Sequence, residues 1–153
     1  MRLQGKPLAQ VEWADLEALV RDQVPESVVL DYKERLPEAT PGARRDFLAD
    51  VAAMANTRGG VLLYGAREAR DTEAGKTDLP EAIVGLAGES AAEAQLRLEQ
   101  TIRSGLDPPL TGCIVRTFPL PVDNHGKARD SAHPAHVAAR VCGSLESRSC
   151  SWT

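Results

Sequence analysis

Three carboxylates lie at the ends or on one face of two short predicted strands, and no other constellation in this sequence could carry chemistry. Glu26 precedes the first strand, Asp31 lies within it, and Glu68 follows the second. The chemistry would be that of carboxylate oxygens held near one another. Glu26 and Asp31 are an odd number of residues apart, so they share a face only if Glu26 precedes the strand or the chain turns there. Pro25 permits such a turn.

Two strands must position these acids. Residues 28–33 alternate and are rich in β-branched side chains, which predicts a strand with Asp31 and Lys33 on one face. Residues 61–64 form a short apolar run, typical of a buried strand beside the first. The acids are therefore expected to meet where two neighbouring strands meet their loops.

A helix is predicted between the two strands. Thr40 is a suitable N-cap and Pro41 a suitable first helical residue, and a wide apolar stripe follows them. Gly59 and Gly60 end the helix, because glycine permits a left-handed cap. The patterns predict further helices at 11–20 and 89–104, short strands at 83–86, 112–120 and 137–142, and an exposed loop or hairpin at 67–82.

Length and composition indicate a single globular domain. The chain has 153 residues, 42% hydrophobic and 26% charged, and domains most often run to about 100 to 150 residues. No apolar stretch approaches the roughly 20 residues that span a bilayer, and the N-terminus lacks the apolar block of a signal peptide. We therefore expect a cytoplasmic protein with no membrane partner. Three cysteines without Cys-x-x-Cys spacing also fit a reducing compartment.

The net charge of −4 disfavours non-specific nucleic-acid binding, which is driven by Lys and Arg releasing phosphate counterions. Any nucleic-acid site must be a local basic patch. Basic side chains do gather in the middle of the chain, and those that could contact phosphate are Lys33, Arg44, Arg45, Arg58 and Arg67. The alternative is a solvated surface of mixed charge.

Two other motifs do not support a function. Ala74-Gly75-Lys76-Thr77 is similar to part of a P-loop, but Arg70 stands where that motif needs glycine. Histidines and cysteines near the C-terminus match no zinc-finger or ribbon spacing: His133, His136, Cys142 and Cys150. All three histidines lie after residue 124, which gives no basis for a nucleophilic triad.

The order of several short segments resembles the Schlafen-type AlbA-like domain, a family described as DNA-binding. The segments are Glu26-Ser27, Leu30-Asp31-Tyr32-Lys33, Ala52 to Gly60 with its Ala-Asn-Thr-Arg-Gly-Gly core, Tyr64-Gly65 and Ile83 to Leu86. The resemblance covers about residues 10 to 110. Asp31 and Tyr32 replace the usual Glu and Phe, and Met54 replaces an aromatic, so the acid keeps its charge but not its reach.

The resemblance implies a role for the three acids. In Schlafen-family ribonucleases, acidic residues resembling Glu26, Asp31 and Glu68 hold a divalent metal and cleave RNA. Mg²⁺ or Mn²⁺ would suit such a site, because these hard cations bind a few carboxylates together with waters and phosphate oxygens. The alternative is structural: Glu26 rims a turn, Asp31 pairs with Lys33 or an arginine, and Glu68 is solvated.

The sequence thus predicts a single α/β (α+β) domain, with a mixed sheet of about four to five strands and about three helices. Residues 8–142 would form the Schlafen AlbA-like domain, and 143–153 a disordered tail. The leading interpretation is a module that binds DNA or RNA. One alternative is a metal-dependent endoribonuclease using Glu26, Asp31 and Glu68. Another is a protein-interaction or dimerisation domain, with a homodimer as its assembly.

Overall fold

A four-stranded mixed sheet forms the centre of the computed structural model, which describes residues 6–73, 75–86, 88–110, 112–119, 135–142 and 151–152. Its strands in spatial order are β1 (Leu30–Lys33), β2 (Gly59–Tyr64), β7 (Ala135–Cys142) and β6 (Ile114–Pro119). The β1–β2 pair is parallel, and the two other pairs are antiparallel. β1 and β6 are therefore the edge strands of this sheet.

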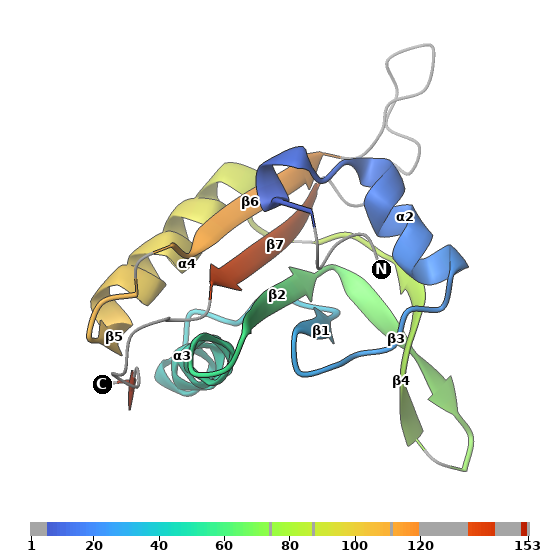
Figure 1. Ribbon diagram of the computed structural model, residues 1–153, viewed down its shortest axis with the longest axis horizontal. Helices are drawn as coiled ribbons and strands as arrows, with labels where there is room; N and C mark the ends of the chain where they lie inside the picture. The colour runs from blue at the N-terminus through green and yellow to red at the C-terminus, as the bar shows by residue number, and fades with distance from the viewer. Residues whose placement is uncertain are drawn as a thin grey trace.

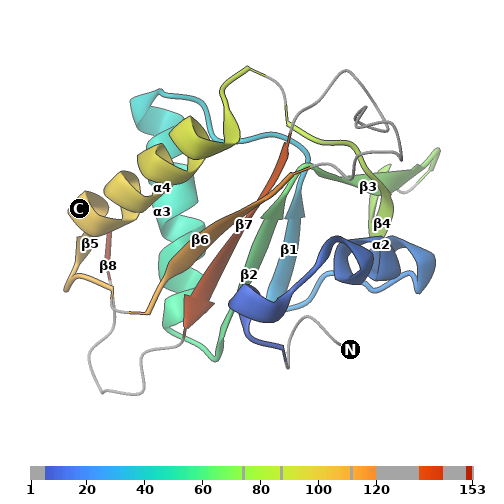
Figure 2. The ribbon, with the colours of Figure 1, turned by 90° about the horizontal axis from the view of Figure 1, so that it is seen from above.

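Helices cover both faces of the sheet, as Figures 1 and 2 show. One face carries η1 (Leu8–Gln10) and α2 (Trp13–Arg21), and the other carries α3 (Pro41–Ala55) and α4 (Ala91–Gly105). α3 and α4 run beside one another on their face (Figure 2). Two small antiparallel ladders complete the fold: β3 (Ala66–Asp71) with β4 (Gly75–Ile83), and β5 (Leu106–Asp107) with β8 (Ser151–Trp152).

Alternation along β2 divides the core in two. Val61 and Leu63 join the cluster beneath α2, whereas Leu62 and Tyr64 join the cluster beneath α3 and α4. The two clusters alternate along β2 because successive side chains of a β-strand point to opposite faces of the sheet. A strand that is apolar on both faces must be covered on both, and β2 is buried along nearly its whole length.

The predicted fold class is confirmed: the described residues form one mixed α/β domain with three α-helices and a four-stranded central sheet. The predicted hairpin at 67–82 is β3–β4, which projects from the body of the domain (Figure 1). The predicted strand at 28–33 begins later, at Leu30, and Val28 is 78% exposed. The tail predicted at 143–153 lies outside the described residues, apart from β8.

The helix starts follow local side-chain chemistry. The Thr40 hydroxyl accepts a hydrogen bond from the Ala43 N–H at 3.2 Å, with Pro41 in the first turn of α3. In the described part of the chain, no helix combines the length and apolar character needed to cross a bilayer.

Candidate functional site

A tight turn brings Glu26 back alongside β1. The Ser27 N–H donates to the Leu30 carbonyl at 2.9 Å, and the Leu30 N–H donates to the Ser27 carbonyl at 3.2 Å. The Glu26 carboxylate then accepts the backbone N–H of Tyr32 at 2.7 Å. Among the described residues, no strand lies on that side of β1, so this contact satisfies an amide that has no partner within the sheet. The turn also explains how Glu26 and Asp31 approach one another despite their odd spacing.

Asp31 and Lys33 lie on the α3 side of the sheet. Their partners in the parallel register are Leu62 and Tyr64, which pack beneath α3. The Lys33 ammonium lies 2.9 Å from an Asp31 carboxylate oxygen and 3.3 Å from one of Asp50, a residue of α3. Lys33 therefore joins the strand to the helix through two carboxylates. The pairing of Asp31 with Lys33 that the structural alternative expected is present.

Glu68 reaches the same region from β3. Gly65 separates β2 from β3 with a φ of +88°, a conformation that favours glycine, and its N–H donates to the Lys33 carbonyl at 2.7 Å. β3 therefore starts beside the end of β1. The Glu68 side chain is only 10% exposed and lies 3.1 Å from the Lys76 ammonium. Glu68 is thus paired and nearly buried, not solvated as the structural alternative expected.

Burial and the neighbouring charges affect the ionisation of Glu26 and Lys33. Burial is the main cause that raises the pKa of Glu26 to about 7, and the hydrogen bond from Tyr32 opposes it. A hydrogen bond with Asp31 and the charges of Asp31 and Glu68 add to the rise. For Lys33, burial lowers the pKa, but Asp31 and Asp50 outweigh it, and the net pKa is raised. Negative charge is therefore concentrated here, and Lys33 offsets part of it.

Glu26, Asp31 and Asp50 line one cavity of about 300 Å³, which we name the acidic cavity. The rest of its wall is formed by Ala53 and Met54 of α3, by Thr57 in the turn after α3, and by residues 27, 28 and 30 around the start of β1. The carboxylate oxygens are the donor type that Mg²⁺ or Mn²⁺ prefers. As arranged, however, no three His, Cys, Asp or Glu side chains of the described ranges are placed to hold a metal ion. Lys33 and Lys76 instead occupy the carboxylates of Asp31 and Glu68.

A second cavity, of about 640 Å³, lies between α3, α4 and the chain before α3. Its cationic side chains are Arg44, Arg45 and Arg97, and Glu38 is the single acid among the described residues of its wall. Buried apolar side chains form its floor: Phe47, Leu48 and Leu98. We name it the basic groove.

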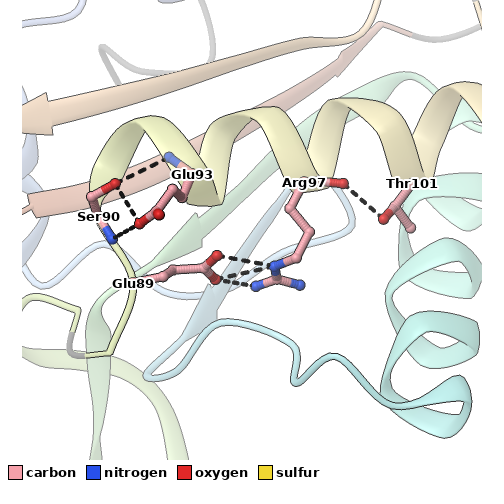
Figure 3. Close-up of polar contacts among 5 residues, drawn as sticks. All are labelled: Glu89, Ser90, Glu93, Arg97 and Thr101. Atoms are coloured by element: carbon pink, nitrogen blue, oxygen red, sulfur yellow. Dashed lines mark hydrogen bonds and ion pairs between the residues drawn. The ribbon is translucent and has the colours of Figure 1, made fainter.

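Arg97 is held in place at the groove by a clamp (Figure 3). Its guanidinium donates to both carboxylate oxygens of Glu89, through Nε at 3.1 Å and through Nη2. Glu89 precedes a capping box in which Ser90 and Glu93 exchange hydrogen bonds and start α4. The bidentate contact fixes the plane of the guanidinium. The cap and the clamp thus set the orientation of one cation in the groove.

The basic residues predicted from the sequence do not form a single patch. Arg44 donates to the Ser104 hydroxyl at 3.1 Å, across the contact between α3 and α4. Arg67 pairs with Glu81 at 2.8 Å in the β3–β4 hairpin, and Arg58 is exposed in the turn after α3. Lys33 lies at the acidic cavity. The structure therefore brings together Arg44 and Arg45, and it places the remaining three elsewhere.

The acidic cavity and the basic groove lie on opposite sides of α3. Pro41, Arg44, Arg45 and Leu48 face the groove, while the acidic cavity is lined from Asp50 onward. Pro41 and Asp50 are nine residues apart, which is about two and a half turns of an α-helix. The remaining half turn places the two residues on opposite faces of α3. The same helix therefore separates a cationic site from an anionic one.

Asp50 and Arg97 belong to these two sites, and the sequence reasoning did not identify either. Asp50 follows the apolar residues Phe47 and Leu48, and an acid in that setting is a signal that was available. For Arg97, the spacing from Glu93 indicates only a solvated helix face. No local pattern connects it to Arg44, because α3 and α4 meet only in the folded chain.

Comparisons with known proteins agree with this architecture. A family model described as Schlafen, AlbA_2 matches residues 26–140. Among solved structures, the fold is similar to the N-terminal domain of a RecG-related protein from Nitrosomonas europaea, determined by NMR in solution. That similarity has a TM-score of 0.55 at 22% sequence identity, and it covers 88% of this chain and 74% of the other. The comparison with curated proteins gave no match.

Proposed function

The chain belongs to the Schlafen AlbA_2 family, and from this premise we propose that it is a nucleic-acid-binding domain. The basic groove is the surface that would bind the nucleic acid. Three arginines surround one cavity of a chain whose net charge is −4. Such a local concentration of arginine is what phosphate binding requires. It is the observation that carries this proposal.

The geometry of the arginines supports phosphate contact. Arg45 is exposed and Arg44 is exposed beside it, both in the first turns of α3. The N-terminal end of a helix carries a partial positive charge, which adds to that of the two guanidinium groups. Arg97 faces the same groove from α4. A phosphate chain crossing the groove would meet cations on both walls.

Fluorescence anisotropy tests the proposal. Labelled DNA and RNA oligonucleotides are titrated with the chain at several salt concentrations between about 50 and 200 mM. We expect binding that weakens as salt increases, because phosphate contacts release counterions. Binding that does not depend on salt, or no binding of either nucleic acid at the lowest salt, would contradict the proposal.

A second candidate function is a metal-dependent endoribonuclease that uses Glu26, Asp31 and Glu68. The convergence of the acids favours it: Glu26 has a pKa of about 7 because of burial and because Asp31 and Glu68 lie nearby. A divalent cation supplies positive charge to the phosphate and to a bound water. In this chain, Glu26 and Asp31 would hold it once Lys33 leaves Asp31, and Glu68 would do so once Lys76 moves.

An RNA cleavage assay with Mn²⁺ tests this candidate. Asp31→Ala should abolish cleavage, whereas Asp46→Ala, an exposed acid of α3 that does not line the acidic cavity, should leave it unchanged. Cleavage that survives Asp31→Ala would exclude the acidic cavity as the catalytic centre. RNA that stays intact with the unaltered chain would exclude the nuclease and leave the binding proposal in place.

A further inference from the structure

The basic groove combines charge with an apolar floor, and this combination selects among nucleic acids. Phosphate contacts alone need only cations on a surface. Here the arginines stand around a cavity of about 640 Å³ whose floor is Phe47, Leu48 and Leu98. Cavities of about 300 to 1,000 Å³ are the size that encloses a small organic group. The groove can therefore receive more than a phosphate.

We propose that the groove binds an unpaired nucleotide of a single-stranded nucleic acid, with its phosphate at Arg44 and Arg45 and its base against the floor. This inference rests on the proposed function and adds the class of nucleic acid. A base in a duplex is stacked and paired, so it cannot enter the cavity without being extruded. A single strand presents such bases freely.

Arg97 is suited to contact the base. Its plane is fixed by the two oxygens of Glu89, and that ion pair offsets much of its charge. A guanidinium held in one plane can stack on a base, as arginine does in RNA-binding proteins. Arg44 is also held, by its hydrogen bond to the Ser104 hydroxyl of α4. The site is thus partly organised before a ligand arrives, which lowers the entropic cost of binding.

Filling the groove tests the inference without altering its charge. Ala39 is exposed and lines the groove, so Ala39→Phe would occupy the space of the base while every arginine remains. Binding of a labelled single strand of about 12 nucleotides is measured by anisotropy, next to a duplex of the same sequence. The other variants are the double substitution Arg44→Gln with Arg45→Gln, and Arg103→Gln, an exposed position on α4 outside the groove.

We expect Ala39→Phe and the double arginine variant each to weaken single-strand binding by about tenfold, the size of one lost base or phosphate contact. Arg103→Gln should change it by less than about twofold, and the duplex should bind more weakly than the single strand and be insensitive to Ala39→Phe. Thermal unfolding of each variant confirms that it is folded.

Three results would overturn the inference. Single-strand binding that Ala39→Phe leaves unchanged would place the strand elsewhere, and equal binding of duplex and single strand would remove the selectivity. Free adenosine or uridine monophosphate that binds as tightly as the strand would make the groove a mononucleotide site. In the first two cases nucleic-acid binding itself stands. No binding of any oligonucleotide would instead contradict the proposed function.

Discussion

Replacing Glu26 by Gln should make the stability of the domain less dependent on pH. Gln keeps the carbonyl oxygen that accepts the Tyr32 N–H, but it has no charge at any pH. In the native chain, burial and the nearby acids raise the pKa of Glu26 from 4.5 to about 7. The folded state therefore binds this proton more tightly than the unfolded chain does.

The sign and size of the effect follow from that difference. The stability that Glu26 contributes is fully present below about pH 4.5 and is lost as the pH rises through about 7. The pKa change corresponds to at most about 3 kcal/mol. Glu26 lies in the wall of an open cavity, so water screens part of this free energy. We therefore expect Glu26 to change the free energy of unfolding by about 1–2 kcal/mol between low and high pH, or the Tm by about 3–8 °C.

Urea unfolding at about pH 5 and about pH 8 measures this contribution. The free energy of unfolding of Glu26→Gln, relative to the unaltered chain, should increase by about 1–2 kcal/mol between the two pH values. Glu73→Gln, an exposed acid in the turn of the β3–β4 hairpin, is the matched control and should show no such increase. A difference for Glu26→Gln that stays constant or decreases with pH would refute the assigned environment of this carboxyl group.

Three further substitutions test the fold around the two sites, each by urea unfolding. Gly60→Ala should destabilise the domain by about 1–3 kcal/mol, because a Cβ there would lie 2.9 Å from the Val29 carbonyl oxygen. The control is Gly42→Ala, whose Cβ meets nothing within 4 Å and which should be neutral or slightly stabilising. Equal effects of the two substitutions on stability would contradict the close packing of β1 and β2. Ser90→Ala should cost about 1 kcal/mol through loss of the cap of α4, and Ser90→Asp should restore it. Lys33→Met should lower the free energy of unfolding by about 1 kcal/mol near pH 7 and by less near pH 4, since it leaves the carboxylates of Asp31 and Asp50 unopposed. A loss of stability that does not depend on pH would contradict the pairing of Lys33 with these two acids.

The elements of the fold could be predicted because their signals are local. Thr40 and Pro41 mark the start of α3, and Gly59 has the positive φ that a helix-ending glycine was expected to adopt. The family resemblance drawn from the Ala-Asn-Thr-Arg-Gly-Gly segment is confirmed by the match over residues 26–140. Cap residues and glycines act through their own backbone, so the sequence shows them directly.

The composition of the two sites could not be predicted in the same way. Lys33 contacts Asp50 across a strand-to-helix interface, and Arg97 faces Arg44 across a helix-to-helix interface. The register of these interfaces depends on core packing, which no short motif encodes. The strand start was wrong by two residues for a related reason, since residues 27–30 turn to bring Glu26 to the edge of β1.

The salt dependence of single-strand binding tests the central claim most directly, namely that the arginines of the basic groove bind nucleic acid. Each neutralised phosphate of a single strand contributes about −0.7 to the slope of log K against log salt. If Arg44 and Arg45 each contact one phosphate while Arg97 contacts the base, these two phosphate contacts contribute about −1.4 to the slope. For the double variant Arg44→Gln with Arg45→Gln, we then expect the slope to be smaller in magnitude by about 1.4. An unchanged slope in that variant would contradict the claim.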